Sequence, residues 1–349
     1  MNHKQWIGFI LFISFIIFST VGLFNYYIDP LWTFSHSNKY NNVQTDFNVR
    51  IQKMNRLYFN DSSKYDGILL GSSRTTYINQ YDFKGMNIFN MAAANMFPRE
   101  YDGYIDVLQK LKGGKLKYII LGIDFFGTRV PEKEVYHKKA YHYLSESKSF
   151  FYRYKHLFSN NLLRYSLRDV MNNYRKPIEY YDRNNVRYHL KVTGKELSKH
   201  VEITFNGNMN KFRNIYKYNS NYRKILENLK DKYKDSKFII FTTPATSKLL
   251  YATLTDAKKF NEYSRWLHDL VNVFGKVYHF YDFNTITNNL NYYVDDEHFY
   301  PYVGTMIVSK LINKKLIESP KNFGIVLTKD NVDDYLKKFK KILESKNDK

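Results

Sequence analysis

The sequence predicts an α/β fold: a parallel sheet covered by helices on both faces, joined to an N-terminal membrane-spanning helix. Short apolar runs bounded by turn residues alternate with stretches of helical periodicity, which is typical of a three-layer α/β/α arrangement. An uncharged N-terminal run has the length needed to cross a bilayer. A long stretch without strand–helix alternation predicts an insertion inside the domain.

The N-terminal run indicates the compartment. Residues 5–28 contain no charged side chain, and residues 6–24 form its apolar core. Lys4 precedes the run and Asp29 follows it, which predicts a cytoplasmic N-terminus and an extracytoplasmic domain. A cleaved signal peptide is the alternative, but the run is long for one and its small-residue site is poor. We expect a single-pass anchor in the cell membrane.

Five apolar runs are predicted to be the strands of the sheet. The longest are nearly continuous rather than alternating, as expected of strands covered on both faces. A five-stranded parallel sheet of flavodoxin-like order fits them. The runs are residues 66–71, 87–90, 117–122, 237–242 and 277–281.

Helical periodicity separates these runs. The helix after the fourth run is expected to end at Gly275, and the helix after the fifth to begin at Pro301. A further strand at residues 323–327 and an amphipathic helix at 331–345 are expected in the C-terminal tail. The four earlier helices are expected at residues 99–111, 222–233, 256–274 and 301–317.

The expected organisation has five parts. The insertion is expected to be a largely helical, basic and aromatic cap over the site; a poorly ordered surface segment is the alternative. The parts are a cytoplasmic stub and anchor (1–28), the first part of the α/β domain (29–126), the insertion (127–220), the second part (221–318) and the C-terminal strand and helix (319–349).

The amino-acid composition limits the kinds of ligand and partner that the chain is expected to bind. The 349 residues include no Cys and carry a formal charge of +21, which excludes disulfides and thiolate metal sites and favours polyanions. An extracytoplasmic location argues against nucleic acid and favours an anionic surface polymer or lipid. No Gly-rich phosphate loop is present, and His137 and His142 have no carboxylate ligand between them. We therefore expect no metal and no cofactor.

Two motifs carry potential chemistry. The first strand ends in Gly71-Ser72-Ser73, which brings a hydroxyl to the carboxyl edge of the sheet, where such folds bind ligands. A serine becomes a good nucleophile only beside a base, and His298 follows Asp295 by three residues. Asp295 is the expected partner of His298, with Asp296 as the alternative. The competing interpretation is that the serines only cap the next helix and the His is structural.

Together, Ser73 after the first strand and Asp295 with His298 near the domain's end resemble the SGNH, or GDSL-like, hydrolase superfamily. The resemblance covers residues 65–126 and 236–316. It implies that Ser73 is the nucleophile, His298 the base and Asp295 its partner. It also implies that the backbone N–H groups of Ser73 and Asn95 stabilise an oxyanion.

The sequence departs from the family at two places. Asn95 stands where the family has a glycine, although Asn tolerates a left-handed φ better than most residues. Asp124 stands where the family has an Asn that donates to the oxyanion, and a carboxylate cannot donate. We expect Asp124 to turn away and pair with Arg74. A protonated Asp124 and an inactive site are the alternatives.

The likeness is strongest to a membrane-anchored branch, the teichoic-acid D-alanylation and polysaccharide O-acetylation (alginate-type) proteins. It implies a serine acyltransferase or esterase that acts on an anionic cell-surface glycopolymer through an acyl-serine. It also implies a membrane-bound O-acyltransferase as partner. A non-catalytic scaffold that recruits this acyltransferase and a stand-alone esterase are the alternatives.

Overall fold

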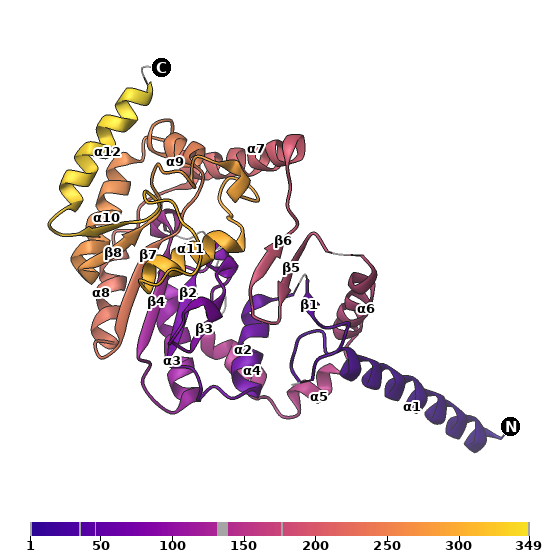
Figure 1. The fold of residues 1–349 in the computed structure, drawn as a ribbon. Coiled ribbons are helices and arrows are strands. Elements are labelled where there is room, and N and C mark those ends of the chain that lie inside the picture. The colour runs from indigo at the N-terminus through magenta and orange to yellow at the C-terminus, as the bar shows by residue number, and fades with distance from the viewer. Residues whose placement is uncertain (1, 35, 46, 131–138, 176, 348–349) are drawn as a thin grey trace.

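The computed structural model describes residues 2–34, 36–45, 47–130, 139–175 and 177–347. Its centre is a six-stranded sheet in the order β3-β2-β4-β7-β8-β9 (Figure 1). The first five strands are parallel, and β9 joins β8 antiparallel. The strands are β2 (Gly67–Gly71), β3 (Ile88–Asn90), β4 (Tyr118–Ile123), β7 (Lys237–Thr242), β8 (Lys276–His279) and β9 (Ile325–Thr328).

The five parallel strands take the spatial order second, first, third, fourth, fifth, which is the flavodoxin-like order. The prediction of a five-stranded, all-parallel sheet was wrong by one strand. The tail strand expected near residues 323–327 pairs with β8 and makes the sheet mixed. An antiparallel edge strand is a common addition to such sheets, and the local sequence does not reveal which edge it joins.

Alternating side chains of the strands enter two separate cores, so both faces of the sheet are covered. In β2, Ile68 and Leu70 belong to the larger core and Leu69 to the other. Helices α3, α8 and α10 contribute to the larger core, and α11 contributes to the second. These helices are α3 (Pro98–Lys112), α8 (Tyr222–Lys232), α10 (Phe260–Phe274) and α11 (Pro301–Leu311).

Two predicted helix boundaries were wrong. The region after β7 contains a separate helix, α9 (Ser247–Leu254), and α10 begins only at Phe260. Lys258 between them has a φ of 55°, which an α-helix cannot include. Helix α11 ends six residues before the expected residue 317, and Asn313 just beyond it has a φ of 53°. The last helix, α12 (Val332–Asn347), packs on the larger core through Phe339.

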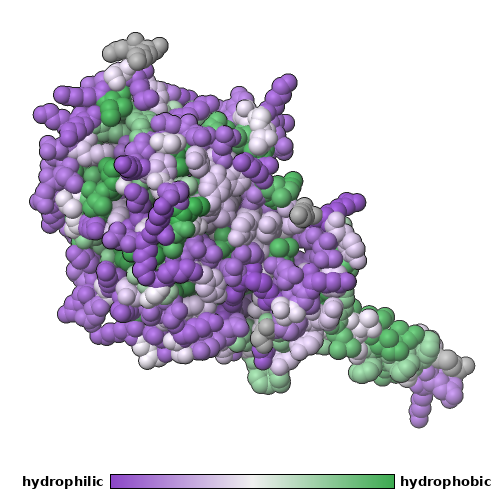
Figure 2. Space-filling model, in the orientation of Figure 1, coloured by the Kyte–Doolittle hydropathy of each residue, from purple (hydrophilic) through white to green (hydrophobic). Residues whose placement is uncertain are grey.

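The N-terminal helix α1 (His3–Ile28) projects from the body of the molecule (Figure 1). Its most apolar window has a mean hydropathy of 2.5 and is almost entirely exposed. Figure 2 shows it as a mainly hydrophobic rod with hydrophilic residues at its free end. The helix is long and apolar enough to cross a membrane.

The segment after α1 folds back on itself. The indole of Trp32 donates to the carbonyl of Asn41 at 2.6 Å, and Arg183 of the insertion stacks over the Trp32 ring at 5.1 Å. Arg183 also donates to the carbonyl of His36 at 2.9 Å. Helix α2 (Val49–Phe59) then leads into the sheet.

The insertion is helical for most of its described length, but it also contains a hairpin that the sequence did not predict. Strands β5 (Glu179–Asp182) and β6 (Arg187–His189) pair with each other, and β5 pairs with β1 (Val43–Gln44). These strands are short and polar, so they carry little periodicity. The helices are α4 (Ala140–Lys148), α5 (Tyr152–His156), α6 (Asn160–Tyr174) and α7 (Gly194–Asn210), which continues into a π-helical turn, Lys211–Ile215.

Candidate active site

The carboxyl ends of three neighbouring parallel strands carry the polar groups of the candidate site. Ser73 follows β2, Asp124 follows β4, and Thr243 follows β7. The loop at residues 294–298 closes over this edge as a tight turn before α11, because the Val294 N–H donates to the His298 carbonyl at 2.8 Å. Groups more than 220 residues apart in sequence therefore meet at one edge of the sheet.

Ser73, His298 and Asp295 form a continuous hydrogen-bonded chain. The Ser73 Oγ lies 2.8 Å from His298 Nε2, and His298 Nδ1 lies 2.8 Å from Asp295 Oδ2. The other carboxylate oxygen, Oδ1, accepts the backbone N–H groups of Glu297 at 2.8 Å and His298 at 2.7 Å. Asp295 is thus fixed by its own loop and fixes the imidazole in turn.

Asp296 points elsewhere. Its carboxylate accepts the Asn208 side-chain amide, at 3.0 Å to Oδ2 and 3.2 Å to Oδ1. Its backbone N–H donates to Thr204 of α7. Of the two candidates for the partner of His298, only Asp295 contacts the imidazole, and Asp296 links the loop to the insertion.

The two adjacent serines have different surroundings. Ser72 is fully buried, and its Oγ accepts the Arg74 backbone N–H at 3.3 Å, which caps the short 3₁₀ helix η1 (Ser73–Tyr77). Ser73 is only partly buried and lines a cavity. The capping interpretation therefore fits Ser72, whereas the Ser73 side chain is directed at His298.

The position of Ser73 depends on two glycines. A Cβ on Gly71 or on Gly122 would collide with the Thr75 hydroxyl, which lies across the ends of β2 and β4. Asn90 holds the same turn from the other side, donating to the carbonyls of Thr75 at 3.2 Å and Ile78 at 2.9 Å. The turn after β2 is therefore packed tightly between its neighbours.

A buried charge cluster lies next to Ser73. Arg74 pairs with Glu297 at 2.8 Å and with Asp124 at 3.5 Å. The Thr243 hydroxyl also donates to Asp124. The expected Arg74–Asp124 pair is present, but Glu297 is the closer partner, and sequence reasoning missed it. The signal was the run of acidic residues before His298, which contains Glu297 as well as the two aspartates.

Burial and charge shift the protonation of these groups in different directions. Burial raises the pKa of Asp124 more than Arg74 and the Thr243 and Ser72 hydrogen bonds lower it. Burial would also lower the pKa of His298, but the charge and hydrogen bond of Asp295, with the charge of Glu297, raise it above its usual 6.5. Burial would raise the pKa of Asp295, but the charge and hydrogen bond of His298, with two backbone hydrogen bonds, lower it to about 2.

Asn95 lies on the loop after β3 and has a left-handed φ of 50°. Helix α2 holds this loop: Lys53 donates to the Ala92 carbonyl at 2.7 Å, and Arg50 donates to the Ala94 carbonyl at 2.9 Å. The Ala94 carbonyl and the Asn95 N–H belong to one trans peptide and point in opposite directions. By holding the Ala94 carbonyl, Arg50 therefore orients the Asn95 N–H away from the Arg50 side chain. Within the described structure, the backbone N–H groups of Ser73 and Asn95 have no acceptor.

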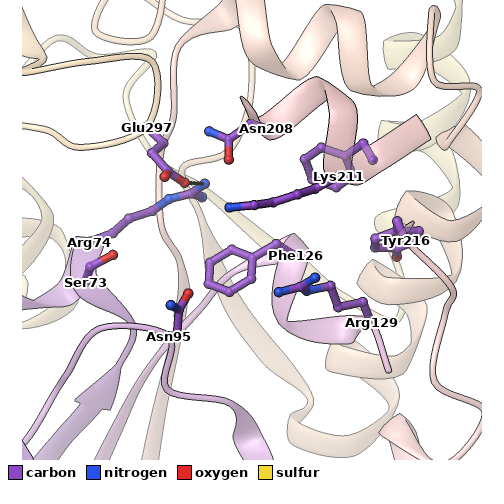
Figure 3. A pocket seen from close by; sticks show the side chains of 10 residues that line it. Ser73, Arg74, Asn95, Phe126, Arg129, Asn208, Lys211, Tyr216 and Glu297 are labelled. Carbon is purple, nitrogen blue, oxygen red and sulfur yellow. Dashed lines mark hydrogen bonds and ion pairs between the residues drawn. The ribbon is translucent and has the colours of Figure 1, made fainter. Parts of the chain in front are cut away.

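A cavity of about 50 Å³ opens beside Ser73 (Figure 3). The end of α7 and the turn after it form one wall, from which Lys211 extends toward Arg74. Three cationic side chains and one carboxylate line the cavity, so its lining has an excess of positive charge. The lining residues are Ser73, Arg74, Asn95, Phe126, Arg129, Asn208, Lys211, Phe212, Tyr216 and Glu297.

Of the two histidines weighed for metal binding, His142 lies in α4 and does not line this cavity. His137 lies outside the described residues, and His142 Nε2 contacts Glu146 at 2.7 Å. Within the described ranges, no group of three or more His, Asp or Glu side chains is arranged to hold a metal ion.

No family model matches the chain, and no curated protein matches it. The interpretation of the site therefore depends on its geometry and on the motifs.

Proposed function

We propose that this chain is an extracytoplasmic serine acyltransferase or esterase of the SGNH type, acting on an anionic cell-surface glycopolymer. The observation that carries the proposal is the Ser73–His298–Asp295 chain, with two 2.8 Å contacts, at the carboxyl edge of the sheet. A hydroxyl, a base and a carboxylate in this order are what nucleophilic acyl transfer requires.

The proposed reaction has two steps, the acylation of Ser73 and its deacylation. Ser73 Oγ attacks the acyl carbonyl carbon while His298 Nε2 takes the hydroxyl proton. The carbon–oxygen bond to the leaving group then breaks, and His298 returns the proton to the leaving oxygen, which yields an acyl-serine. An acceptor hydroxyl, from a sugar, a polyol or water, repeats these steps and frees Ser73.

Donors for the oxyanion would come from the backbone. The N–H groups of Ser73 and Asn95 have no acceptor, and such a donor contributes about 3 kcal/mol in comparable sites. Asp124 would not join them, because its carboxylate is held by Arg74 and Thr243. This arrangement leaves the oxyanion hole without the family's Asn.

The cavity supports the choice of substrate class. The cavity, about 50 Å³, has room beside Ser73 for a short acyl group. Its excess positive charge, with Lys211 and Arg129 contributed by the insertion, suits an acceptor that carries negative charge. A membrane-bound O-acyltransferase is the partner we propose as the source of the acyl group.

Labelling with a serine-reactive fluorophosphonate tests the assignment directly. Ser73→Ala should abolish labelling and lower ester hydrolysis about 10⁴-fold or more, with His298→Ala causing a similar loss that does not add to it. Ser72→Ala is the matched control and should keep the label. Labelling that maps to Ser72, or survives in Ser73→Ala, would overturn the assignment. Unchanged polymer acylation in cells with Ser73→Ala would favour the scaffold alternative.

A further inference from the structure

The insertion exposes a group of aromatic side chains close to α1. We use the name aromatic elbow for residues 150–158, which connect α4 to α6 and include α5. Phe150 is 76% exposed and Phe158 is 51% exposed. Phe151 and Tyr154 are also exposed. Exposed aromatic side chains gathered in one short segment of a water-soluble surface are costly, so they indicate a partner.

The elbow is fixed against the side of α1. The Phe158 ring lies edge-on to Phe18, with ring centroids 6.3 Å apart, and a Cβ on Gly22 would lie 2.7 Å from that ring. Asn25 of α1 donates to the Leu157 carbonyl at 2.7 Å and accepts from the Ser166 hydroxyl of α6 at 2.7 Å. These contacts fix the height of the elbow along the helix.

That height lies within the apolar run. The run ends at residue 24, and an α-helix rises 1.5 Å per residue. Gly22 therefore lies about 3 Å, and Phe18 about 9 Å, inside the end of the run. A bilayer crossed by α1 must include Phe158 at this depth, because Phe158 contacts both residues.

The charges of the segment suit the same location. Residues 150–158 include Arg153 and Lys155 but no acidic residue, and Lys148 lies two residues before them. Lys148 and Lys155 are exposed. Basic side chains beside aromatic rings that enter a membrane can reach lipid headgroups, while their aliphatic stems and the rings remain in the apolar layer.

We propose that the aromatic elbow inserts into the leaflet of the bilayer on the domain's side, as a second membrane contact beside α1. The occupant of this surface is lipid, with acyl chains around Phe150 and Phe158 and headgroups at the lysines. Its continuity with α1 favours lipid over a protein partner. In Figure 2 a hydrophobic spot stands at the lower edge of the body, near α5, in addition to the hydrophobic rod of α1. The proposal requires α1 to cross the membrane, but it does not depend on the chemistry of Ser73.

The absence of Cys from the sequence makes a clean test possible. Single cysteines at Phe150 and Phe158 carry an environment-sensitive fluorophore in the full chain, reconstituted in vesicles of phosphatidylcholine and phosphatidylglycerol. Phospholipids with a nitroxide on the acyl chain then act as quenchers. Phe15 of α1 is the positive control. Tyr81, which is 51% exposed like Phe158 but lies on the α/β domain, is the matched negative control.

We expect blue-shifted emission at Phe150 and Phe158, with quenching at least about half of that at Phe15, and no quenching at Tyr81. Labels at both elbow positions that behave like the Tyr81 label would overturn the proposal and leave a protein partner as the explanation. Absence of quenching at Phe15 would also overturn it, because α1 would then not be in the bilayer. The Phe150 variant keeps the test valid if Phe158→Cys disturbs packing on Gly22.

Discussion

At the scale of single residues, the protonation of His298 would determine when the proposed acyl-transfer site can work. Its pKa is raised above 6.5, mainly by Asp295 against the opposing effect of burial. Only the neutral imidazole can accept the Ser73 proton. We therefore expect the rate of ester hydrolysis to rise with pH, with a midpoint above that of a free histidine.

Glu297→Gln tests the electrostatic part of this account. The charge of Glu297 contributes to the raised pKa of His298, so its removal should move the midpoint of kcat/KM against pH toward lower pH. The amide can still accept from Arg74, which keeps the loop in place. An unchanged midpoint would show that Glu297 only positions the loop. Asp295→Asn is the comparison and should lower the rate about 10⁴-fold through the wrong imidazole tautomer.

The same pair also links stability to pH. The folded-state pKa of Asp295 is lowered to about 2, against 3.8 when unfolded. Ionised Asp295 therefore contributes about 2 kcal/mol to the free energy of unfolding above pH 4, and this contribution is lost as the pH falls from about 4 to about 2. Stability measured by urea unfolding should fall less steeply with acid in Asp295→Asn. An identical acid dependence in both proteins would contradict the lowered pKa.

Asp124 stands where the SGNH hydrolases, which the motifs resemble, have an Asn. Asp124→Asn should keep the fold and leave ester hydrolysis unchanged, because the side chain is already occupied by Thr243 and Arg74. Arg74→Ala should lower activity about 10²-fold, because it releases both Asp124 and Glu297 beside the nucleophile. A clear increase in activity in Asp124→Asn would mean that the carboxylate opposes the oxyanion.

The main residues of the site were predictable because each strand can be recognised from its local sequence, and the carboxyl ends of parallel strands lie at one edge of the sheet. Ser73 follows a recognisable strand, and Asp295 and His298 precede a recognisable helix, so the fold class alone brings them to one edge. Their catalytic role stays a prediction. Lys53, Arg50 and Asn208 were missed because their contacts with the site join distant parts of the chain, and nothing in their local sequence distinguishes them from surface residues.

At the scale of elements, the turn after β2 has little room for change. Gly71→Ala should lower stability by about 1–3 kcal/mol, because the added methyl collides with Thr75. Thermal unfolding measures this loss. Gly207→Ala is the control: nothing lies within 4 Å of a Cβ there and the residue is inside α7, so the change should be neutral or slightly stabilising. Equal stability in both variants would contradict the tight packing.

Elements with strong periodicity were predicted well, and those defined by pairing were not. Helices α3 and α8 lie within one residue of their expected bounds, because apolar stripes and Gly113 mark them. The hairpin of β5 and β6 was missed because its strands have four and three residues and alternate little. Strand β1, the other partner of β5, is more than 130 residues away in sequence, and only the folded chain brings the two together.

At the scale of the whole molecule, the orientation of the chain across the membrane is the main untested prediction. We expect the domain outside the cytoplasm, because Lys4 precedes the apolar run and Asp29 follows it. Alkaline phosphatase fused after residue 349 should be active, since it folds only outside the cytoplasm, and green fluorescent protein at the same place should be dark. The reverse pattern would place the domain, and the proposed chemistry, inside.

The clamp between Trp32, Asn41 and Arg183 has a mechanical consequence. An anchor followed by a loose tether would let the domain sample a thick shell of the cell envelope. Here the chain beyond α1 folds back and is held by the insertion. A domain anchored by α1 would therefore stay at a nearly constant distance from the membrane. The proposed catalytic groups would then be confined to a thin layer parallel to the bilayer, and a polymer substrate outside that layer would have to be brought to them.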